Sequence, residues 1–322
     1  MQKVIREKAI ELLRSGKVDR VLGWKEGEFF YDQTPHLFLS PEEVERTFVY
    51  NGFSGANLSK YLVKEGLKEG VVAVFLKPCD TYSFSQLLKE HRIARDKIWA
   101  VGIPCEGKLD IELLRKMGIR GIKTIEEKGD ELLVSTIYGE KTVAKKDVLA
   151  ERCANCKSRK HVLYDELLGE EGEVLDSARF DQIEKLEQMT SEERFAFWQN
   201  ELSRCIRCNA CRNVCPACTC EKCVFDNADS GIASKAPASS FEEQNFHIIR
   251  AFHVVGRCTD CGECSRVCPQ GIPLHLINRK FIKDINAFYG AYQAGENPDE
   301  RAPLTNYSTE DMEPGDVFKK GE

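Results

Sequence analysis

Two short runs in the first third of the chain are continuously apolar. Residues 71–76 (VVAVFL) and 98–103 (IWAVGI) contain no charged side chain, as is typical of strands buried on both faces of a parallel sheet. Helical periodicity follows each run, at residues 83–91 and 109–117. This alternation of buried strand and helix predicts an α/β domain with a mostly parallel sheet.

Weaker patterns complete residues 1–150, which we assign to this α/β domain. We expect helices at residues 2–15 and 57–64, short strands at 18–24, 28–31 and 121–125, and a hairpin over 131–143. Residues 151–190, which include a C-x2-C pair, form a connecting segment.

The last third of the chain predicts helices in place of strands. One helix is expected to begin after Thr190, which can cap its first turn, and another spans residues 241–255, after a polar loop at 229–240. Each helix leads directly into a cysteine-rich segment. We assign residues 191–285 to an α-helical domain, and residues 286–322, which are polar and rich in Pro and Gly, to an extended C-terminal tail.

Composition and charge narrow the class of protein. The 322 residues are 42% hydrophobic and 30% charged, with a formal net charge of −6, which gives no reason to expect a nucleic-acid partner. No apolar run approaches the roughly 18 residues that span a bilayer, and the charged N-terminus lacks the apolar core of a signal peptide. We expect a cytoplasmic protein without membrane insertion.

Fifteen cysteines are the unusual feature of the composition. An odd number in a chain without a secretion signal argues against a disulfide framework, because the cytosol keeps thiols reduced. Eleven of the cysteines lie between Cys205 and Cys268, whereas residues 1–150 contain two. This distribution indicates metal binding.

Two copies of one motif contain eight of these cysteines. Residues 205–216 and 258–269 both read C-x2-C-x2-C-x3-C-P and start 53 residues apart. Three cysteines at this spacing wrap a loop around one [4Fe–4S] cluster, and the cysteine before proline ligates the other cluster. The predicted ligands are Cys205, Cys208, Cys211 and Cys268 for the first cluster, and Cys258, Cys261, Cys264 and Cys215 for the second.

Zinc is the alternative metal for these motifs. Zinc sites use pairs of C-x2-C, and they need neither a third cysteine at the same interval nor the Cys-Pro ending. The pattern therefore favours two [4Fe–4S] clusters that exchange electrons. Gly262, beside Cys261, leaves room for backbone N–H groups to approach the sulfurs.

The distance between the motifs indicates one kind of iron–sulfur domain. Forty-two residues separate Cys215 from Cys258, and a helix is expected before each motif. In these respects the region of about residues 190–285 resembles the α-helical ferredoxin domain of heterodisulfide reductase small subunits and of the succinate dehydrogenase iron–sulfur subunit. The resemblance implies a role in electron transport.

A second group of cysteines follows the predicted strands. Cys79 lies in Lys-Pro-Cys-Asp after the first buried strand, and Cys105 lies in Gly-Ile-Pro-Cys after the second. Adjacent parallel strands end at the same edge of a sheet, where Cys153 and Cys156 could complete a site of four thiolates. A third [4Fe–4S] cluster, a zinc ion and plain core cysteines are the three interpretations.

Three further cysteines follow the first motif directly. Cys218, Cys220 and Cys223 form a C-x-C-x2-C pattern. They could ligate a further cluster with a donor from elsewhere, or Cys220 and Cys223 could pair with Cys153 and Cys156. Spacing alone leaves both interpretations open.

The α/β domain resembles a known family in four segments. Residues 52–56 (GFSGA), 77–80 (KPCD), 102–105 (GIPC) and 153–156 (CANC) are similar, also in order, to segments of the coenzyme F420 hydrogenase/formate dehydrogenase β-subunit family. The resemblance implies a [4Fe–4S] cluster, usually FAD, and a setting in anaerobic metabolism. Here, however, the ferredoxin module follows this domain instead of preceding it, and the α/β part is short.

A flavin site is predicted just before the helix expected at Asn57. Gly52, Ser54 and Gly55 precede that helix, whose N-terminal N–H groups could hold a phosphate, although a plain turn explains them equally well. The chain has no G-x-G-x-x-G or P-loop motif. No arrangement of Ser, His and Asp indicates a self-sufficient catalytic centre.

These features predict an iron–sulfur electron-transfer subunit of a multi-subunit cytoplasmic redox complex. It would relay electrons through two or three [4Fe–4S] clusters to or from other redox subunits, namely a flavoprotein or a protein like heterodisulfide reductase, formate dehydrogenase or hydrogenase. The alternative is an enzyme, a flavin-containing oxidoreductase β subunit that reacts directly with F420 or NAD(P)H. We expect this chain to be a component of an oxidoreductase that transfers electrons, more than an enzyme that is catalytic by itself.

Overall fold

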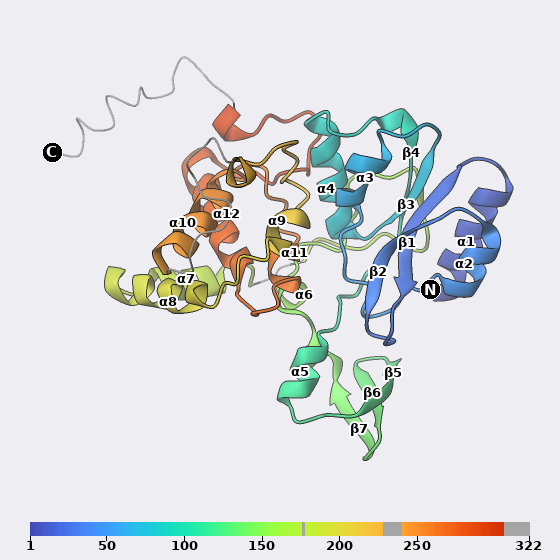
Figure 1. Ribbon diagram of the computed structural model, residues 1–322, viewed down its shortest axis with the longest axis horizontal. Helices are drawn as coiled ribbons and strands as arrows, with labels where there is room; N and C mark the ends of the chain where they lie inside the picture. The colour runs from blue at the N-terminus through green and yellow to red at the C-terminus, as the bar shows by residue number, and fades with distance from the viewer. Residues whose placement is uncertain (176–177, 228–239, 306–322) are drawn as a thin grey trace.

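A computed structural model describes residues 1–175, 178–227 and 240–305 of the protein. Figure 1 shows an α/β region built around a sheet and, beside it, a helical region formed by the later part of the chain. The predicted fold class is confirmed. No helix in these described ranges is both long and apolar enough to cross a membrane.

A five-stranded sheet forms the centre of the α/β region. In spatial order its strands are β2 (Gln33–Phe38), β1 (Arg20–Glu26), β3 (Val72–Leu76), β4 (Ile98–Gly102) and β8 (Glu166–Leu167). The strands β1, β3, β4 and β8 run parallel, and β2 is antiparallel to β1. Every residue of β3 is buried, as its apolar run predicts.

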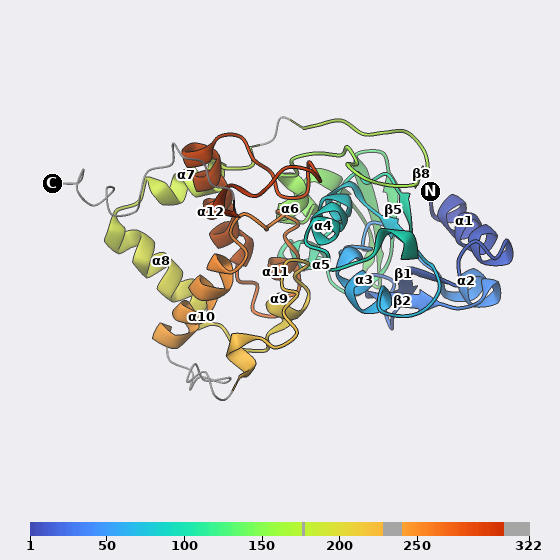
Figure 2. The same cartoon turned by 90° about the horizontal axis from the view of Figure 1, so that it is seen from above.

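Helices cover both faces of this sheet. The pairs are α1 (Gln2–Arg14) with α2 (Pro41–Thr47), and α3 (Ser59–Glu65) with α4 (Pro78–Lys89) (Figure 2). Residues 80–87 of α4 are all buried, because this helix lies between the sheet and the helical region. Its Ser83 hydroxyl is 2.8 Å from the hydroxyl of Thr259, which belongs to the second cysteine motif.

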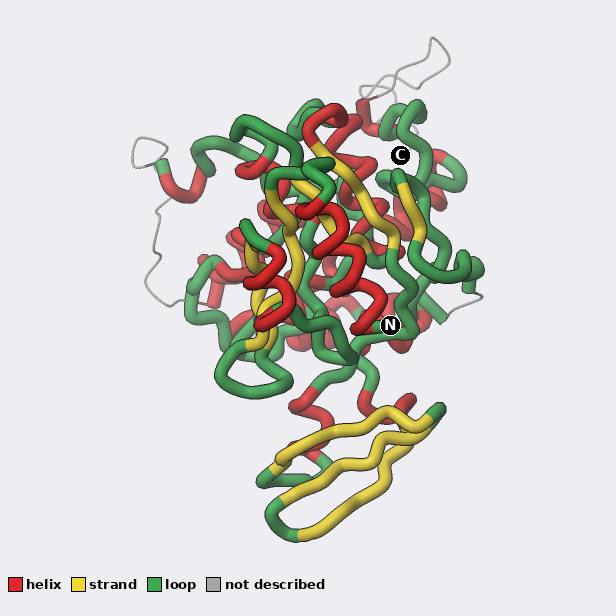
Figure 3. Tube along the Cα trace, turned by 90° about the vertical axis from the view of Figure 1, so that its right-hand side faces the viewer, coloured by secondary structure: helices red, strands yellow, loops and turns green. Residues whose placement is uncertain are grey.

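A three-stranded antiparallel sheet projects from the rest of the protein (Figure 3). It consists of β5 (Ile122–Lys128), β6 (Glu131–Thr136) and β7 (Gly139–Ala144), and it packs against α5 (Ile111–Lys116). The hairpin predicted over residues 131–143 is confirmed. The strand expected at 121–125 exists, but it pairs with this hairpin and not with the parallel sheet.

The strand expected at residues 28–31 is wrong. These residues form a hairpin loop, which closes where the Gly27 N–H donates to the Asp32 carbonyl at 2.7 Å, and the strand that follows is β2. Pro35 argues against a strand there, since proline removes a ladder hydrogen bond. The protein tolerates Pro35 because β2 is an edge strand.

The helical region contains the two helices that were expected before the motifs. Its helices are α6 (Glu151–Ala154), α7 (Asp181–Glu187), α8 (Ser191–Ser203), α9 (Ala210–Asn213), α10 (Ser240–Phe252), α11 (Glu263–Arg266) and α12 (Leu274–Tyr289). Thr190 caps α8, because its hydroxyl accepts the Glu193 N–H at 3.2 Å. The loop predicted at 229–240 lies outside the described residues, apart from its last residue.

The described part of the predicted tail packs against its own chain. Helix α12 extends to Tyr289, and after it Tyr292 is buried and donates its hydroxyl to the Gly256 carbonyl at 3.0 Å. Gly295 approaches α4 so closely that a Cβ there would lie 1.9 Å from the Tyr82 carbonyl oxygen. Residues 306–322 of the tail lie outside the described residues.

Phe75 tests the core of the α/β region. It is fully buried in β3, with its ring 5.6 Å from that of Phe48 between centroids. Phe75→Ala should lower the free energy of unfolding by about 3–5 kcal/mol, as measured by denaturant titration with circular dichroism. Leu67→Ala, at a residue that is 81% exposed, should change it by less than about 0.5 kcal/mol. Equal losses in both variants would contradict this core.

Candidate metal centres

Cys79 and Cys105 lie at one edge of the sheet because their strands end together. The strands β3 and β4 pair in parallel with Leu76 opposite Gly102, and each cysteine follows its member of that pair by three residues. Cys79 lies in the first turn of α4, and Cys105 lies in the loop after β4. The two side chains reach the same cavity from neighbouring elements.

This cavity brings together the four cysteines of the predicted third site. Cys79, Cys105, Cys153 and Cys156 all line it, and so does Cys261 of the second motif. Its volume of about 40 Å³ is room for roughly three water molecules. The third candidate site therefore adjoins the dicluster motifs.

Cationic side chains line the same cavity. They include Lys108, Arg152 and Lys157, and burial lowers the pKa of Lys108 and lowers that of Lys157 to about 8. Burial also raises the pKa of Cys79 and Cys156, so these thiols keep their protons until a metal displaces them. Thiols surrounded by buried cations fit an iron–sulfur cluster, whose thiolate-ligated core is anionic.

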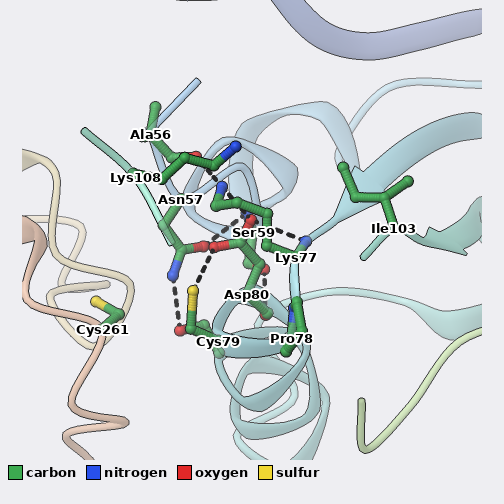
Figure 4. A network of polar contacts seen from close by, with 12 residues as sticks. Ala56, Asn57, Ser59, Lys77, Pro78, Cys79, Asp80, Ile103, Lys108 and Cys261 are labelled. Atoms are coloured by element: carbon green, nitrogen blue, oxygen red, sulfur yellow. Dashed lines mark hydrogen bonds and ion pairs between the residues drawn. The ribbon is translucent and has the colours of Figure 1, made fainter. Parts of the chain in front are cut away.

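A buried ion pair holds the start of α4 in place (Figure 4). Lys77 Nζ lies 2.7 Å from Asp80 Oδ2 and donates to the Ala56 carbonyl at 2.8 Å. The other carboxylate oxygen of Asp80 accepts the Cys79 thiol at 3.7 Å, and the Asp80 carbonyl accepts the Ser59 hydroxyl at 2.7 Å. Because Lys77 and Asp80 are both buried, this network fixes the position of Cys79.

The two cysteine motifs have the same backbone structure. Arg207 and Asp260 occupy matching positions 53 residues apart, as do Asn209 and Gly262, and their φ angles are 51°, 56°, 60° and 67°. The short helices α9 and α11 also begin and end at matching positions. At Gly262 a Cβ would lie 2.6 Å from the Cβ of Arg152, so this position combines a left-handed φ with close packing.

Thiols of the motifs interact within the two predicted ligand sets. Burial raises the pKa of the three leading cysteines of the second motif, and Cys215 of the first motif raises it further. Burial likewise raises the pKa of Cys211, and Cys208 and Cys268 add to this effect. These neighbours agree with the exchange of the fourth cysteine between motifs, while the ligand assignment itself stays a prediction.

Within the described residues, no three Cys, His, Asp or Glu side chains converge tightly enough to hold a single metal ion. The group that the four N-terminal thiols would bind stays a prediction.

Helix α10 contributes two buried side chains beside the cysteines. His247 Nε2 lies 3.2 Å from Cys205 Sγ, and burial lowers the pKa of this histidine to about 3, so the ring is neutral. Arg250 is 2% exposed, and in the described part of the chain none of its guanidinium nitrogens has a hydrogen-bond partner. An orphaned cation at this place fits a neighbouring anionic cluster.

Arg152 connects the two cysteine regions. Its Nη1 donates to the Cys261 carbonyl at 2.9 Å and pairs with Glu263, and its Nη2 donates to the Gly55 carbonyl at 2.9 Å. Burial alone would raise the pKa of Glu263, but Arg152 and Arg266 lower it to about 2. The carboxylate therefore stays ionised inside the protein.

The loop with Gly52, Ser54 and Gly55 is bonded within the protein. The Ser54 hydroxyl contacts the Gln33 amide and accepts the Asn51 N–H at 2.9 Å. Helix α3 begins two residues later than the helix that was expected here. The Ser54 hydroxyl is thus already engaged, and flavin binding by this loop stays a prediction.

The C-x-C-x2-C cysteines lie apart from the cavity. Cys218 is hydrogen-bonded to Cys215, Cys220 is exposed, and Cys223 packs in the core that contains Phe225. None of the three is among the described residues that line the cavity. The pairing of Cys220 and Cys223 with the C-x2-C segment has no support here, because Cys79 and Cys105 occupy that place.

A family model named 4Fe-4S dicluster domain matches residues 201–272. The chain therefore carries two [4Fe–4S] clusters in this domain. The β subunit of an F420-dependent formate dehydrogenase from Methanocaldococcus jannaschii is 24% identical, over 84% of this chain and 86% of its own length. Subunit β of F420-dependent formate dehydrogenase 1 from Methanococcus maripaludis is 25% identical, over 68% of this chain and 73% of its own.

The chain is similar to the β subunits of F420-dependent formate dehydrogenases, and it carries a 4Fe-4S dicluster domain. The resemblance stated from the sequence is confirmed. A chain of a solved F420-reducing [NiFe] hydrogenase complex from Methanosarcina barkeri aligns with 63% of this chain and 86% of its own length, at 13% identity and a TM-score of 0.41.

Sequence reasoning missed the charged and polar side chains that lie around the cysteines. Arg152 and Glu263 each adjoin a cysteine of a C-x2-C pattern, so their positions carried a weak signal. The sequence gives no signal for His247 and Arg250 beyond their helical spacing, because their contacts depend on how α10 packs against both motifs.

Arg152 should stabilise the contact between the two cysteine regions. Arg152→Met removes one partner of the buried Glu263 carboxylate, a change that costs about 3–5 kcal/mol, so the midpoint of thermal unfolding should fall. Arg115→Met breaks an exposed ion pair with Glu112 and should cost less than about 1 kcal/mol. If both variants unfold at the same temperature, Arg152 does not have this role.

Proposed function

We propose that this chain is an electron-transfer subunit that passes electrons through two or three [4Fe–4S] clusters inside a multi-subunit redox complex. The observation that carries the proposal is the position of Cys261. It belongs to the second motif, and it also lines the cavity of the four N-terminal cysteines. The proposed third site therefore adjoins the second motif, as an electron relay through neighbouring clusters requires.

The proposed ligands follow from the motifs and from the cavity. The sets are Cys205, Cys208, Cys211 and Cys268 for the first cluster; Cys258, Cys261, Cys264 and Cys215 for the second; and Cys79, Cys105, Cys153 and Cys156 for the third. The support for the third set is that its four thiols line one cavity together with cationic side chains. We keep residues 1–150 and 191–285 as the two proposed domains.

The protein supplies the surroundings in which such a relay works. A [4Fe–4S] cluster, when bound, takes up and releases single electrons. Buried residues such as Phe246 and Leu274 pack beside the motif cysteines and exclude water. Lys108 and Lys157 place positive charge around the third site.

The partners we propose are redox subunits of a formate dehydrogenase or hydrogenase, or a heterodisulfide reductase-like or flavin-bearing protein. The support is the names of the relatives, which are β subunits of F420-dependent formate dehydrogenases. A β subunit has other subunits by definition. Exposed Cys208 and Ile206, 61% exposed, bring the first motif to the surface where a partner could approach.

Iron counting tests the third centre. The anaerobically purified chain should contain about twelve irons, and as many acid-labile sulfides, for three clusters. Cys105→Ser should lower the count to about eight, because it removes a ligand from the cavity and leaves both motifs intact. Cys220→Ser alters an exposed thiol away from the cavity, so this control should keep the full count.

Other iron counts would contradict separate parts of the proposal. About eight irons, unchanged by Cys105→Ser, would exclude the third cluster and leave the two-cluster relay intact. Zinc in place of iron, or visible absorbance that does not bleach on reduction, would contradict electron transfer as a whole.

The alternative function is a flavin-bearing oxidoreductase, which the F420-dependent relatives favour. If it is right, the purified chain should release about one FAD, and a reduced hydride carrier such as F420H2 or NADPH should bleach the clusters without any other subunit. The electron-transfer proposal expects neither result from the isolated chain. Ser54→Ala, which leaves every proposed cluster ligand in place, should reduce flavin content only under the alternative.

A further inference from the structure

A buried guanidinium lies among the cysteines of both motifs. Arg250 is on α10, the helix that leads into the second motif, and it is 2% exposed. Its Nε, Nη1 and Nη2 atoms lack hydrogen-bond partners among the residues that the structure describes. A charge buried without compensation is costly, and an anionic group bound beside Arg250 would compensate it.

The surroundings of Arg250 identify that group. Apolar residues of α10, including Phe246, pack in the same core as Cys211 and Cys264. Ile249, the residue before Arg250, packs against the same core. Cys211 belongs to the first proposed ligand set and Cys264 to the second, so the core beside which α10 buries Arg250 adjoins both sets.

The buried carboxylates of the second motif have other partners. Asp260 and Glu263 are the buried acids of the second motif, and both are already paired. Asp260 forms ion pairs with Arg179 and Arg279. The cations of Glu263 are Arg152 and Arg266.

We propose that the positive charge of Arg250 raises the reduction potentials of both clusters of the dicluster domain. The inference rests on the proposed ligand sets. Reduction adds one negative charge to a cluster, and a nearby buried cation stabilises the more negative form because the protein interior screens charge weakly. Net charge and surroundings are known determinants of cluster potential. Without Arg250, both clusters become harder to reduce.

His247 provides a comparison on the same helix. It precedes Arg250 by three residues, and its hydrogen bond of 3.2 Å goes to Cys205 of the first set. A neutral donor to one ligand sulfur should affect one cluster. Arg250 should affect the potentials of both clusters, so substitutions of the two side chains should shift different sets of potentials.

A redox titration of the anaerobic full-length protein, followed by electron paramagnetic resonance, tests the inference. Arg250→Met should shift both dicluster midpoint potentials to more negative values, and Arg250→Lys should restore most of the shift because it keeps the charge. His247→Leu should shift the first cluster alone. Lys280→Met removes one positive charge from α12, where Lys280 is 43% exposed, and should leave both potentials unchanged.

Four results would overturn the inference. The first three are unchanged potentials in Arg250→Met with its iron content intact, a shift of one cluster alone, and an equal shift in Arg250→Met and Arg250→Lys. Loss of iron in both Arg250 variants would also overturn it, since the residue would then serve assembly. The proposed function fails separately, if the unaltered chain contains no iron–sulfur clusters.

Discussion

The structure depends on one buried electrostatic contact, between Arg152 and Glu263. Arg152 stands in the segment that follows the α/β domain, and Glu263 lies between two cysteines of the second motif. The same guanidinium also bonds the carbonyls of Gly55 and Cys261. Because the Glu263 carboxylate is fully buried and the Arg152 side chain is only 9% exposed, the pair holds the two cysteine regions in one relative position.

The cations around the cysteines also need partners of opposite charge. Lys77 is paired with Asp80 and Arg152 with Glu263, so these cations have acids in the protein. Within the described residues, the guanidinium of Arg250 has no hydrogen-bonded acid, and Lys108 bonds a backbone carbonyl. Thiolate-ligated clusters are the natural counter-charge for the cations that remain, since buried charges are found paired.

The sheet sets the positions of two thiols of the proposed third site. Parallel pairing of β3 with β4 places Leu76 opposite Gly102, and the cysteines that follow by three residues reach one cavity. Helix α4 then forms the wall between the sheet and the helical region, where Ser83 meets Thr259. A site built at a strand edge thus lies directly against the dicluster motifs.

The sequence by itself determined the buried strands, the helices before the motifs and the dicluster chemistry, because periodicity and cysteine spacing are local properties. The sequence did not predict the edge strand β2, which contains Pro35, and it assigned β5 to the parallel sheet instead of the antiparallel one. Tertiary structure alone decided that Cys261 borders the cavity of the four N-terminal cysteines and that α10 packs against cysteines of both motifs. The hydrogen bond from Arg152 to Cys261 joins residues 109 positions apart, and no local sequence pattern predicts such a contact.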